Sequence, residues 1–177
     1  PCYGSYPYVT SSPCVASFAP YGAGLPGNAQ NRGVHCVFKA YTTRVGNGHL
    51  PTELLGDEAE MLRTIGNEFG STTGRSRRPG WLNIPEIRRA CELHGATNIY
   101  MTKVDILGQM PSIKICRSFT SGNDSKPVYK DMLPWGDCSG LPNRPLPDSL
   151  CGYIHEVSLG LRRKIDFVSV GPRAEDL

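Results

Sequence analysis

A loop rich in glycine, threonine and arginine is the segment of this sequence best suited to binding a small anion. It covers residues 66–78 and has the sequence GNEFGSTTGRSRR. Its three glycines allow unusual backbone angles and the close approach of a ligand. Two threonine hydroxyls and three guanidiniums lie within seven residues. These groups suit carboxylates or phosphates, because each arginine can bond two oxygens at once.

Two other interpretations of this loop stay open on composition alone. It can be a solvated basic loop, since arginine side chains are mostly exposed. It can also contact the backbone of a nucleic acid, but no aromatic residues alternate with the arginines to stack on bases. The formal net charge of +3 is also low for a nucleic-acid binder. We therefore expect no nucleic-acid partner.

Two shorter motifs follow predicted strands. The first is Thr102, Lys103, Val104 and Asp105, in which the carboxylate can accept both N1–H and the exocyclic amine of guanine while the lysine stem lies along the purine. The second is Ser169, Val170, Gly171 and Pro172. Ligands of α/β sheets bind at the carboxyl ends of strands, so the two motifs can bracket one flat ligand. The alternative is a chance K-x-D and a strand that ends in a Gly-Pro turn.

The elements that position these motifs predict an α/β fold, with a mostly parallel central sheet and flanking helices. Strand-like and helix-like patterns alternate along the chain beyond Arg32. The strands are predicted at residues 37–45, 98–102, 113–117 and 164–170. The helices are predicted at 57–65, from an Asn83 cap to Gly95, and from an Asp148 or Ser149 cap to Leu161. Residues 118–147 are rich in turn formers and give no predicted element.

Length and composition favour one domain with ordinary thiols. The chain has 177 residues, and domains usually have roughly 100–200. No apolar run approaches the roughly 20 residues of a membrane span, so we expect no membrane partner. The seven cysteines lack C-x-x-C spacing and are expected to be mostly free in a reducing cytosol. The four histidines have no metal-ligand spacing, and the glycine string at residues 22–27 has no preceding strand to make it a dinucleotide loop.

The first 31 residues differ from the rest. They contain five prolines, four glycines and four tyrosines, and the first charged residue is Arg32. Disordered segments usually carry charge and lack aromatics. We therefore expect an ordered, loop-rich segment that lies against other protein surface. Because the sequence begins at Pro1 without Met, we also expect this segment to be interior to a larger protein.

Taken together, the motifs resemble the adenylosuccinate synthetase family. They occur in the family's order across nearly the whole chain, and their combination is far more specific than any single one. The matching segments are residues 6–12 (YPYVTSS), 41–48 (YTTRVGNG), 51–54 (PTEL), 66–78, 80–82 (GWL), 93–107 around the K-x-D motif, and 168–172.

The resemblance implies a reaction and a set of binding residues. The family phosphorylates the 6-oxygen of inosine monophosphate with GTP, after which the amino group of aspartate displaces the phosphate. Thr10 would contact the monophosphate, Arg75 would also touch the inosine nucleotide, and Arg77 would also lie near GTP. The aspartate loop, at about residues 66–78, would bind through Ser71, Thr72, Thr73, Gly74, Arg75, Ser76 and Arg77. The guanine-recognition part, at about residues 98–177, would bind through Lys103, Val104, Asp105, Ser169, Val170 and Gly171.

The resemblance also implies what this sequence lacks. It matches the carboxy-terminal part of a single α/β domain whose sheet is incomplete without the amino-terminal half. In the family that half carries the phosphate loop, the catalytic aspartate and histidine, and the magnesium ligands. No catalytic or metal-binding residue is therefore expected in residues 1–177, and Mg²⁺ would be held mainly elsewhere. We expect the chain to belong to a carbon-nitrogen ligase and to be inactive alone.

Partners and alternatives follow from the same resemblance. The expected partners are IMP, aspartate and GTP, and the expected assembly is a cytoplasmic homodimer. One alternative is the related viral synthetase, which joins aspartate to a guanine monophosphate to give a 2-aminoadenine precursor. The other is a non-catalytic guanine-nucleotide-binding module that has kept the loops without the chemistry.

Overall fold

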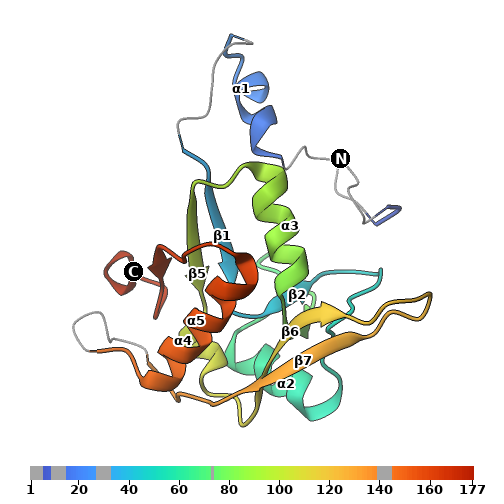
Figure 1. Cartoon of the computed structure of the whole chain (residues 1–177), viewed down its shortest axis with the longest axis vertical. Helices are drawn as coiled ribbons and strands as arrows, with labels where there is room; N and C mark the ends of the chain where they lie inside the picture. The colour runs from blue at the N-terminus through green and yellow to red at the C-terminus, as the bar shows by residue number, and fades with distance from the viewer. Residues whose placement is uncertain (1–5, 9–14, 27–32, 73, 139–144) are drawn as a thin grey trace.

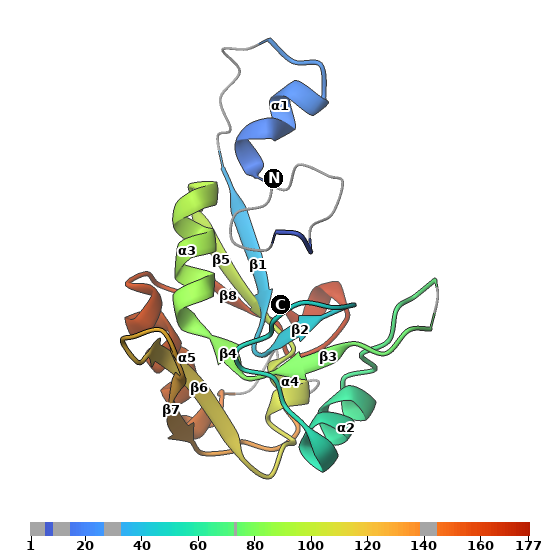
Figure 2. The ribbon, with the colours of Figure 1, turned by 90° about the vertical axis from the view of Figure 1, so that its right-hand side faces the viewer.

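A computed structural model describes residues 6–8, 15–26, 33–72, 74–138 and 145–177 (Figure 1). Its centre is a three-stranded parallel sheet in the order β1-β5-β8. The strands are β1 (His35–Lys39), β5 (Asn98–Thr102) and β8 (Phe167–Val168). Figure 2 shows α3 (Ile84–His94) and α5 (Asp148–Leu161) on one side of these strands. On the other side lie α2 (Gly56–Ile65) and the pair β2 (Thr42–Arg44) with β3 (Arg78–Gly80).

The parallel register brings the carboxyl ends of the three strands to one edge. Lys39 pairs with Thr102, and Met101 pairs with Val168. Two bonds continue the pairing past the strand ends, from Ala40 N to Thr102 O at 2.8 Å and from Ser169 N to Met101 O at 2.8 Å. The K-x-D motif and the Ser169 motif therefore emerge side by side at the edge where ligands of α/β folds bind.

The predicted α/β fold is confirmed, but the described strands form three small sheets. β2 and β3 are antiparallel, and β4 (Leu82–Asn83), β6 (Ile113–Phe119) and β7 (Pro127–Met132) form a mixed sheet in which β4 is parallel and β7 antiparallel to β6. The predicted strand at residues 37–45 is two strands, because Ala40 and Tyr41 turn into the core with 0% and 1% exposure.

Helix α3 follows its sequence signals closely. Asn83 caps it by accepting a hydrogen bond from Glu86 N at 3.3 Å, and Gly95 ends it in the left-handed region with φ of 64°. Glycine adopts this conformation without steric cost, which is why it commonly ends helices. Helix α2 also ends at its predicted glycine, Gly66. The prediction that Asp148 or Ser149 caps α5 is wrong, because Pro147 is the N-cap and no side chain caps the helix.

Two strand predictions differ from the structure. Residues 164–170 form a strand only at β8, because the Asp166 carboxylate accepts the Ile99 N–H at 2.8 Å in place of a strand carbonyl. Strand β7 lies in the stretch where no element was predicted. Its residues are exposed or half-buried throughout, so it lacks the alternation of buried and exposed residues that marks a strand.

The core lies between the parallel sheet, α3 and α5. Tyr153 of α5 is fully buried, and its hydroxyl donates to Ala40 O at 2.6 Å. Its ring lies 5.1 Å from the Trp135 ring, whose Nε1 donates to Val104 O at 2.9 Å. The short helix α4 (Val104–Leu107) is thereby fixed below the end of β5. The hydrogen bond from Trp135 to Val104 O therefore helps to fix the position of the K-x-D motif.

The remaining described elements are short. They are the 3-10 turns η1 (Ala16–Phe18) and η2 (Ala174–Asp176) and the helix α1 (Ala19–Gly22). Ala16 N donates to His94 Nδ1 at 3.2 Å, so part of the proline-rich segment does contact the rest of the chain. Within its described residues, Ala16–Gly22 is helical, whereas a loop was predicted.

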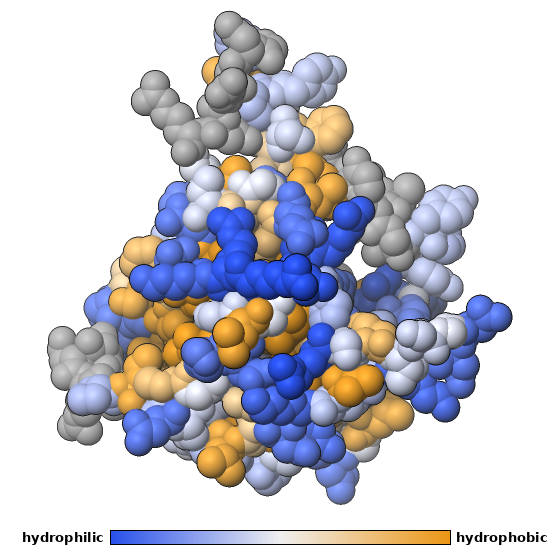
Figure 3. Space-filling model, viewed as in Figure 1, coloured by the Kyte–Doolittle hydropathy of each residue, from blue (hydrophilic) through white to orange (hydrophobic). Residues whose placement is uncertain are grey.

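One face of the molecule carries a hydrophilic band. Figure 3 shows a hydrophilic band at the level where α5 ends, and Arg162, Arg163 and Lys164, which follow that helix, are exposed. Within the described ranges, no helix combines the length and apolarity needed to cross a membrane.

Candidate functional site

A pocket of about 690 Å³ lies at the carboxyl ends of β1, β5 and β8. Lys103, Asp105, Ser169 and Gly171 all line it, together with Gly66 and Asn67 from the end of α2. Pockets of roughly 300–1,000 Å³ are typical of small-molecule sites. The two motifs that sequence analysis placed at separate strand ends therefore meet in one cavity.

Val37 and Tyr100 form the apolar side of this pocket. Successive residues of a strand point to opposite faces, so these two face away from α3 while Cys36 and Ile99 face toward it. Val37 is 65% exposed although it is strongly apolar. An exposed apolar surface beside convergent polar groups is typical of a binding site.

Lys103 begins the K-x-D motif in an uncommon backbone conformation. Its φ of 64° and ψ of 25° place it in the left-handed region, where non-glycine residues are rare and often functional. Its Nζ donates to Gly66 O at 3.1 Å. The lysine therefore links the K-x-D motif to the first residue of the arginine-rich loop.

The Asp105 side chain is nearly buried at the pocket wall, with 9% exposure. Burial raises the pKa of this carboxyl, while backbone N–H groups of Asp105 and Ile106 and the charge of Lys103 act in the opposite direction. A carboxylate in such a site bonds strongly to a donor that reaches it, because little water competes.

Ser169 and Gly171 form the opposite wall. Ser169 Oγ donates to Gly171 O at 2.7 Å. The chain then folds back on itself, since Arg173 N donates to Asp176 Oδ2 at 2.8 Å and Val170 N donates to Asp176 O at 2.8 Å. A Cβ on Gly171 would collide with the Asp176 carboxylate, so this close approach requires glycine.

Two predicted guanine-binding residues are absent from the pocket lining. Val104 is fully buried and Val170 is 4% exposed, and both belong to the hydrophobic core. Their side chains hold the motifs in place from behind. Any contact of these residues with a ligand would have to come from the backbone.

The arginine-rich loop folds as a short hairpin. Phe69 and Ser76 form an antiparallel bridge, and Gly70 N donates to Arg75 O at 2.8 Å. Gly74 turns the chain with φ of 63°. At the tip, the exposed predicted residues are Ser71, Thr72, Gly74, Arg75 and Ser76. Thr73 lies outside the described residues, and so does Thr10, the residue predicted to contact the monophosphate.

Glu68 holds the base of this hairpin, and sequence analysis assigned it no role. Its carboxylate is 0% exposed and accepts from Lys39 Nζ at 2.7 and 2.8 Å, from Tyr41 Oη at 2.7 Å and from Arg77 Nη1 at 2.7 Å. Burial by itself would raise the pKa of Glu68, but these three hydrogen-bond donors outweigh it and hold the pKa below its ordinary value. The only local sequence signal for this role is that Glu68 is the one acidic residue in a loop that contains three arginines.

Burial also shifts the pKa values of Lys39 and Tyr41, two of the donors to Glu68. Burial lowers the pKa of Lys39 despite its bonds to Glu68. Burial and then the hydrogen bond to Glu68 raise the pKa of Tyr41. A Cβ on Gly66 would lie 2.6 Å from the Tyr41 hydroxyl, so the glycine that ends α2 also makes room for this network.

The Arg78 guanidinium, one of the three in the loop, bonds to Glu53 and to two backbone carbonyls. Its Nε donates to Glu53 Oε1 at 2.6 Å, its Nη2 pairs with Glu53 Oε2, and its Nη1 donates to Gly46 O at 3.0 Å and Gly48 O at 2.8 Å. These bonds lower the pKa of Glu53. Arg78 therefore joins β3 to the 46–53 turn, and it is not a free anion ligand as its sequence position suggested.

The other reactive groups of the described residues are potential metal ligands and cysteine thiols. Among the described residues, no group of three His, Cys, Asp or Glu side chains is arranged to hold a metal ion. Cys36, Cys91, Cys116, Cys138 and Cys151 are free thiols, as predicted. Cys2 and Cys14 lie outside the described residues.

Comparisons of the sequence and of the structure with known proteins identify the same family. The family model for adenylosuccinate synthetase matches residues 2–177. The chain is 39% identical over 184 residues to the adenylosuccinate synthetase of Thermotoga maritima and 40% identical over 181 residues to that of Thermus thermophilus. Each alignment covers 98% of this chain and 44% of the relative.

A solved structure agrees with the sequence comparison. The fully ligated adenylosuccinate synthetase from Plasmodium falciparum matches with a TM-score of 0.87 and 31% identity, over 98% of this chain and 46% of that one. The chain thus spans a little under half the length of the relatives it matches. Its sequence and its fold together show that the chain belongs to the adenylosuccinate synthetase family.

Proposed function

We propose that this chain supplies the guanine-recognition and aspartate-binding parts of a GTP-dependent ligase that joins aspartate to inosine monophosphate. The family to which it belongs uses GTP and Mg²⁺. The product would be adenylosuccinate, an intermediate of purine nucleotide biosynthesis. Membership of the family supports the reaction class, and the pocket at the carboxyl ends of the parallel strands supports the division of roles.

The observation that carries the proposal is the convergence of Lys103, Asp105, Ser169 and Gly171 on one pocket. A carboxylate can accept two parallel hydrogen bonds from guanine, at N1–H and at the exocyclic amine, which adenine cannot offer. The low exposure of Asp105 strengthens this pairing. Val37 and Tyr100 offer apolar surface to the flat base.

The hairpin suits the second substrate. Thr72 and Arg75 lie at its exposed tip, where hydroxyl and guanidinium donors can reach a dicarboxylate. Arg77 is held at the base by Glu68. Gly66 and Asn67 join the hairpin to the guanine pocket, so occupation of one site can influence the position of the other.

The catalytic residues and most magnesium ligands are assigned to protein outside this chain. The described residues offer no metal-binding cluster of their own. By resemblance to the family, Mg²⁺ would be held by the nucleotide phosphates and by residues outside the chain, where it would neutralise charge during phosphoryl transfer. Our proposal is that the chain alone gives no turnover.

A chimera tests this proposal directly. This chain would replace the matching segment of the Thermotoga maritima relative, and adenylosuccinate formation would be measured with GTP or ATP as donor. We expect activity with GTP and IMP, and none from the 177-residue chain alone. The viral-type alternative depends on the residue at the catalytic-aspartate position, which the chimera takes from the relative, so it is tested by assaying guanine monophosphate as acceptor with this protein's own amino-terminal half. An inactive, folded chimera, with tight GTP binding by the chain alone, would support the non-catalytic module.

A further inference from the structure

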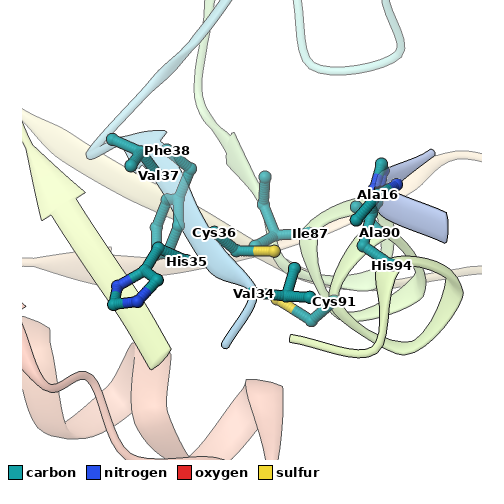
Figure 4. A pocket seen from close by; sticks show the side chains of 10 residues that line it. All are labelled: Ala16, Val34, His35, Cys36, Val37, Phe38, Ile87, Ala90, Cys91 and His94. Carbon is teal, nitrogen blue, oxygen red and sulfur yellow. Dashed lines mark hydrogen bonds between the residues drawn. The ribbon is translucent and has the colours of Figure 1, made fainter. Parts of the chain in front are cut away.

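A second cavity, of about 380 Å³, lies between β1 and α3. It shares Val37 with the guanine pocket, but its other lining residues differ, because it faces α3 whereas the guanine pocket lies at the carboxyl ends of the strands. Most of its lining is apolar, but two thiols, Cys36 and Cys91, also line it (Figure 4). Neither cysteine belongs to the site described above.

The secondary structure brings these two thiols together. Cys36 and Phe38 occupy the positions of β1 that pack toward the core. Cys91 lies four residues after Ile87, on the face of α3 that packs against the sheet. Figure 4 shows the Cys36 side chain pointing from β1 toward α3 and the Cys91 side chain pointing from α3 toward β1.

The two thiols differ in their surroundings. Cys91 is 2% exposed. Burial raises the pKa of Cys91 to about 11, and the neighbouring Cys36 thiol acts in the same direction. Cys36 is only half-buried, so it is the thiol that a reagent from solvent reaches first. Cys91 then stands next to it as a protonated partner.

We propose that Cys36 and Cys91 form a redox-active dithiol that a peroxide converts into an intramolecular disulfide. The Cys36 thiolate attacks one peroxide oxygen, the O–O bond breaks, and the released hydroxide takes up a proton to give water. The resulting Cys36 sulfenic acid is attacked by the Cys91 sulfur. The S–S bond forms, the S–O bond breaks, and the Cys91 proton leaves with the hydroxyl as a second water.

The balance is two thiols and one hydrogen peroxide giving one disulfide and two waters. The two sulfurs together lose two electrons, which the peroxide oxygens gain. The bond would tie β1 to α3. Cys36 is three residues before Lys39, one of the donors to Glu68, so the tie acts on the strand that supports the base of the hairpin.

Peptide mapping of the oxidised chain tests the proposal. The folded 177-residue chain is treated with an equimolar amount of hydrogen peroxide, the remaining thiols are blocked with N-ethylmaleimide, and the digest is analysed by mass spectrometry. We expect a cross-linked peptide pair containing Cys36 and Cys91, the loss of two free thiols per chain, and full recovery after dithiothreitol.

Matched variants and a denatured sample make the test specific. Cys36→Ser and Cys91→Ser should each abolish the cross-link, whereas Cys151→Ser, at an exposed cysteine of α5, should leave it intact. The same oxidation in concentrated urea should give mixed pairings, since there the fold no longer selects partners. Because this comparison uses only the unmodified sequence, it stands even if a variant fails to fold.

Three results would overturn the proposal. The first is oxidation of Cys36 to sulfinic acid with no cross-link to Cys91. The second is a cross-link of Cys36 to another cysteine in the folded chain. The third is the same set of pairings in the folded and urea-treated samples, which would show that the fold does not select this pair.

Discussion

Arg77 Nη1 donates a 2.7 Å hydrogen bond to Oε2 of Glu68, a carboxylate that has no exposed surface. The same carboxylate accepts hydrogen bonds from Lys39, the last residue of β1, and from Tyr41, two residues later. One buried group therefore connects the parallel sheet to the base of the arginine-rich hairpin. Donors from two separate segments, residues 39–41 and Arg77, bond to this carboxylate.

Glu68→Gln should destabilise the folded chain by about 3–5 kcal/mol, because removing one member of a buried ion pair leaves the other charges uncompensated. Urea unfolding followed by circular dichroism measures the change. Glu60→Gln is the matched control, since Glu60 is 65% exposed in its pair with Arg63 and should cost less than about 1 kcal/mol. Equal losses in the two variants would contradict the role given to Glu68.

Acid should reduce the contribution of Glu68 to the free energy of unfolding. Burial would raise its pKa, but its three donors hold the pKa below the ordinary value, and an unfolded glutamate titrates at about 4.3. A folded pKa below the unfolded one gives stability that is complete above pH ~4.3 and disappears as the pH falls through the folded pKa. The stability gap between the wild type and Glu68→Gln should therefore narrow below pH ~4. A gap that stays constant from pH 7 to pH 3 would refute this.

Arg78→Lys should destabilise the chain by about 1–3 kcal/mol. A lysine keeps the charge, but it cannot bond both oxygens of Glu53 and two carbonyls at the same time. Thermal or urea unfolding gives the difference. Arg89→Lys, at an exposed position of α3, should change stability by less than about 0.5 kcal/mol, and a similar effect at both sites would count against a specific Arg78 bridge.

Asp105→Asn should change the base preference of the active chimera from guanine toward xanthine. Xanthine carries an oxygen where guanine has the exocyclic amine, and an asparagine amide can donate to that oxygen. We expect KM for GTP to rise at least about tenfold, or about 1.4 kcal/mol, and xanthosine triphosphate to become the better donor. Asp131→Asn, at an exposed position of β7, controls for charge. An unchanged preference would place guanine elsewhere.

Gly171→Ala should weaken the pocket wall. The added methyl group would collide with the Asp176 carboxylate, which also receives the Arg173 N–H. We expect a loss of about 1–3 kcal/mol and weaker GTP binding by the chimera. Gly152→Ala is the contrasting control, because a Cβ there meets nothing within 4 Å in the exposed side of α5. It should stabilise the helix by about 0.5–1 kcal/mol.

The sequence was most informative where short-range signals decide the structure. Asn83 and Gly95 bound α3 as expected, and β5 lies at the predicted residues. Caps, glycine stops and apolar periodicity act over a few residues, so they can be recognised without the fold. Strand β7 has no such local signal, because it is held in place by pairing with β6. The Asp166 side chain shortened β8 through a bond to Ile99, 67 residues away along the chain.

The sequence by itself determined the family, the order of the motifs, and the residue types that can bind guanine and a dicarboxylate. Only the tertiary structure decided how those residues are used. It brought Lys103, Asp105, Ser169 and Gly171 into one pocket, moved Val104 and Val170 into the core, and committed Arg78 to Glu53. It also gave Glu68 its role. The physical reason is that burial and pairing depend on contacts between distant segments, whereas sequence patterns report only the preferences of neighbouring residues.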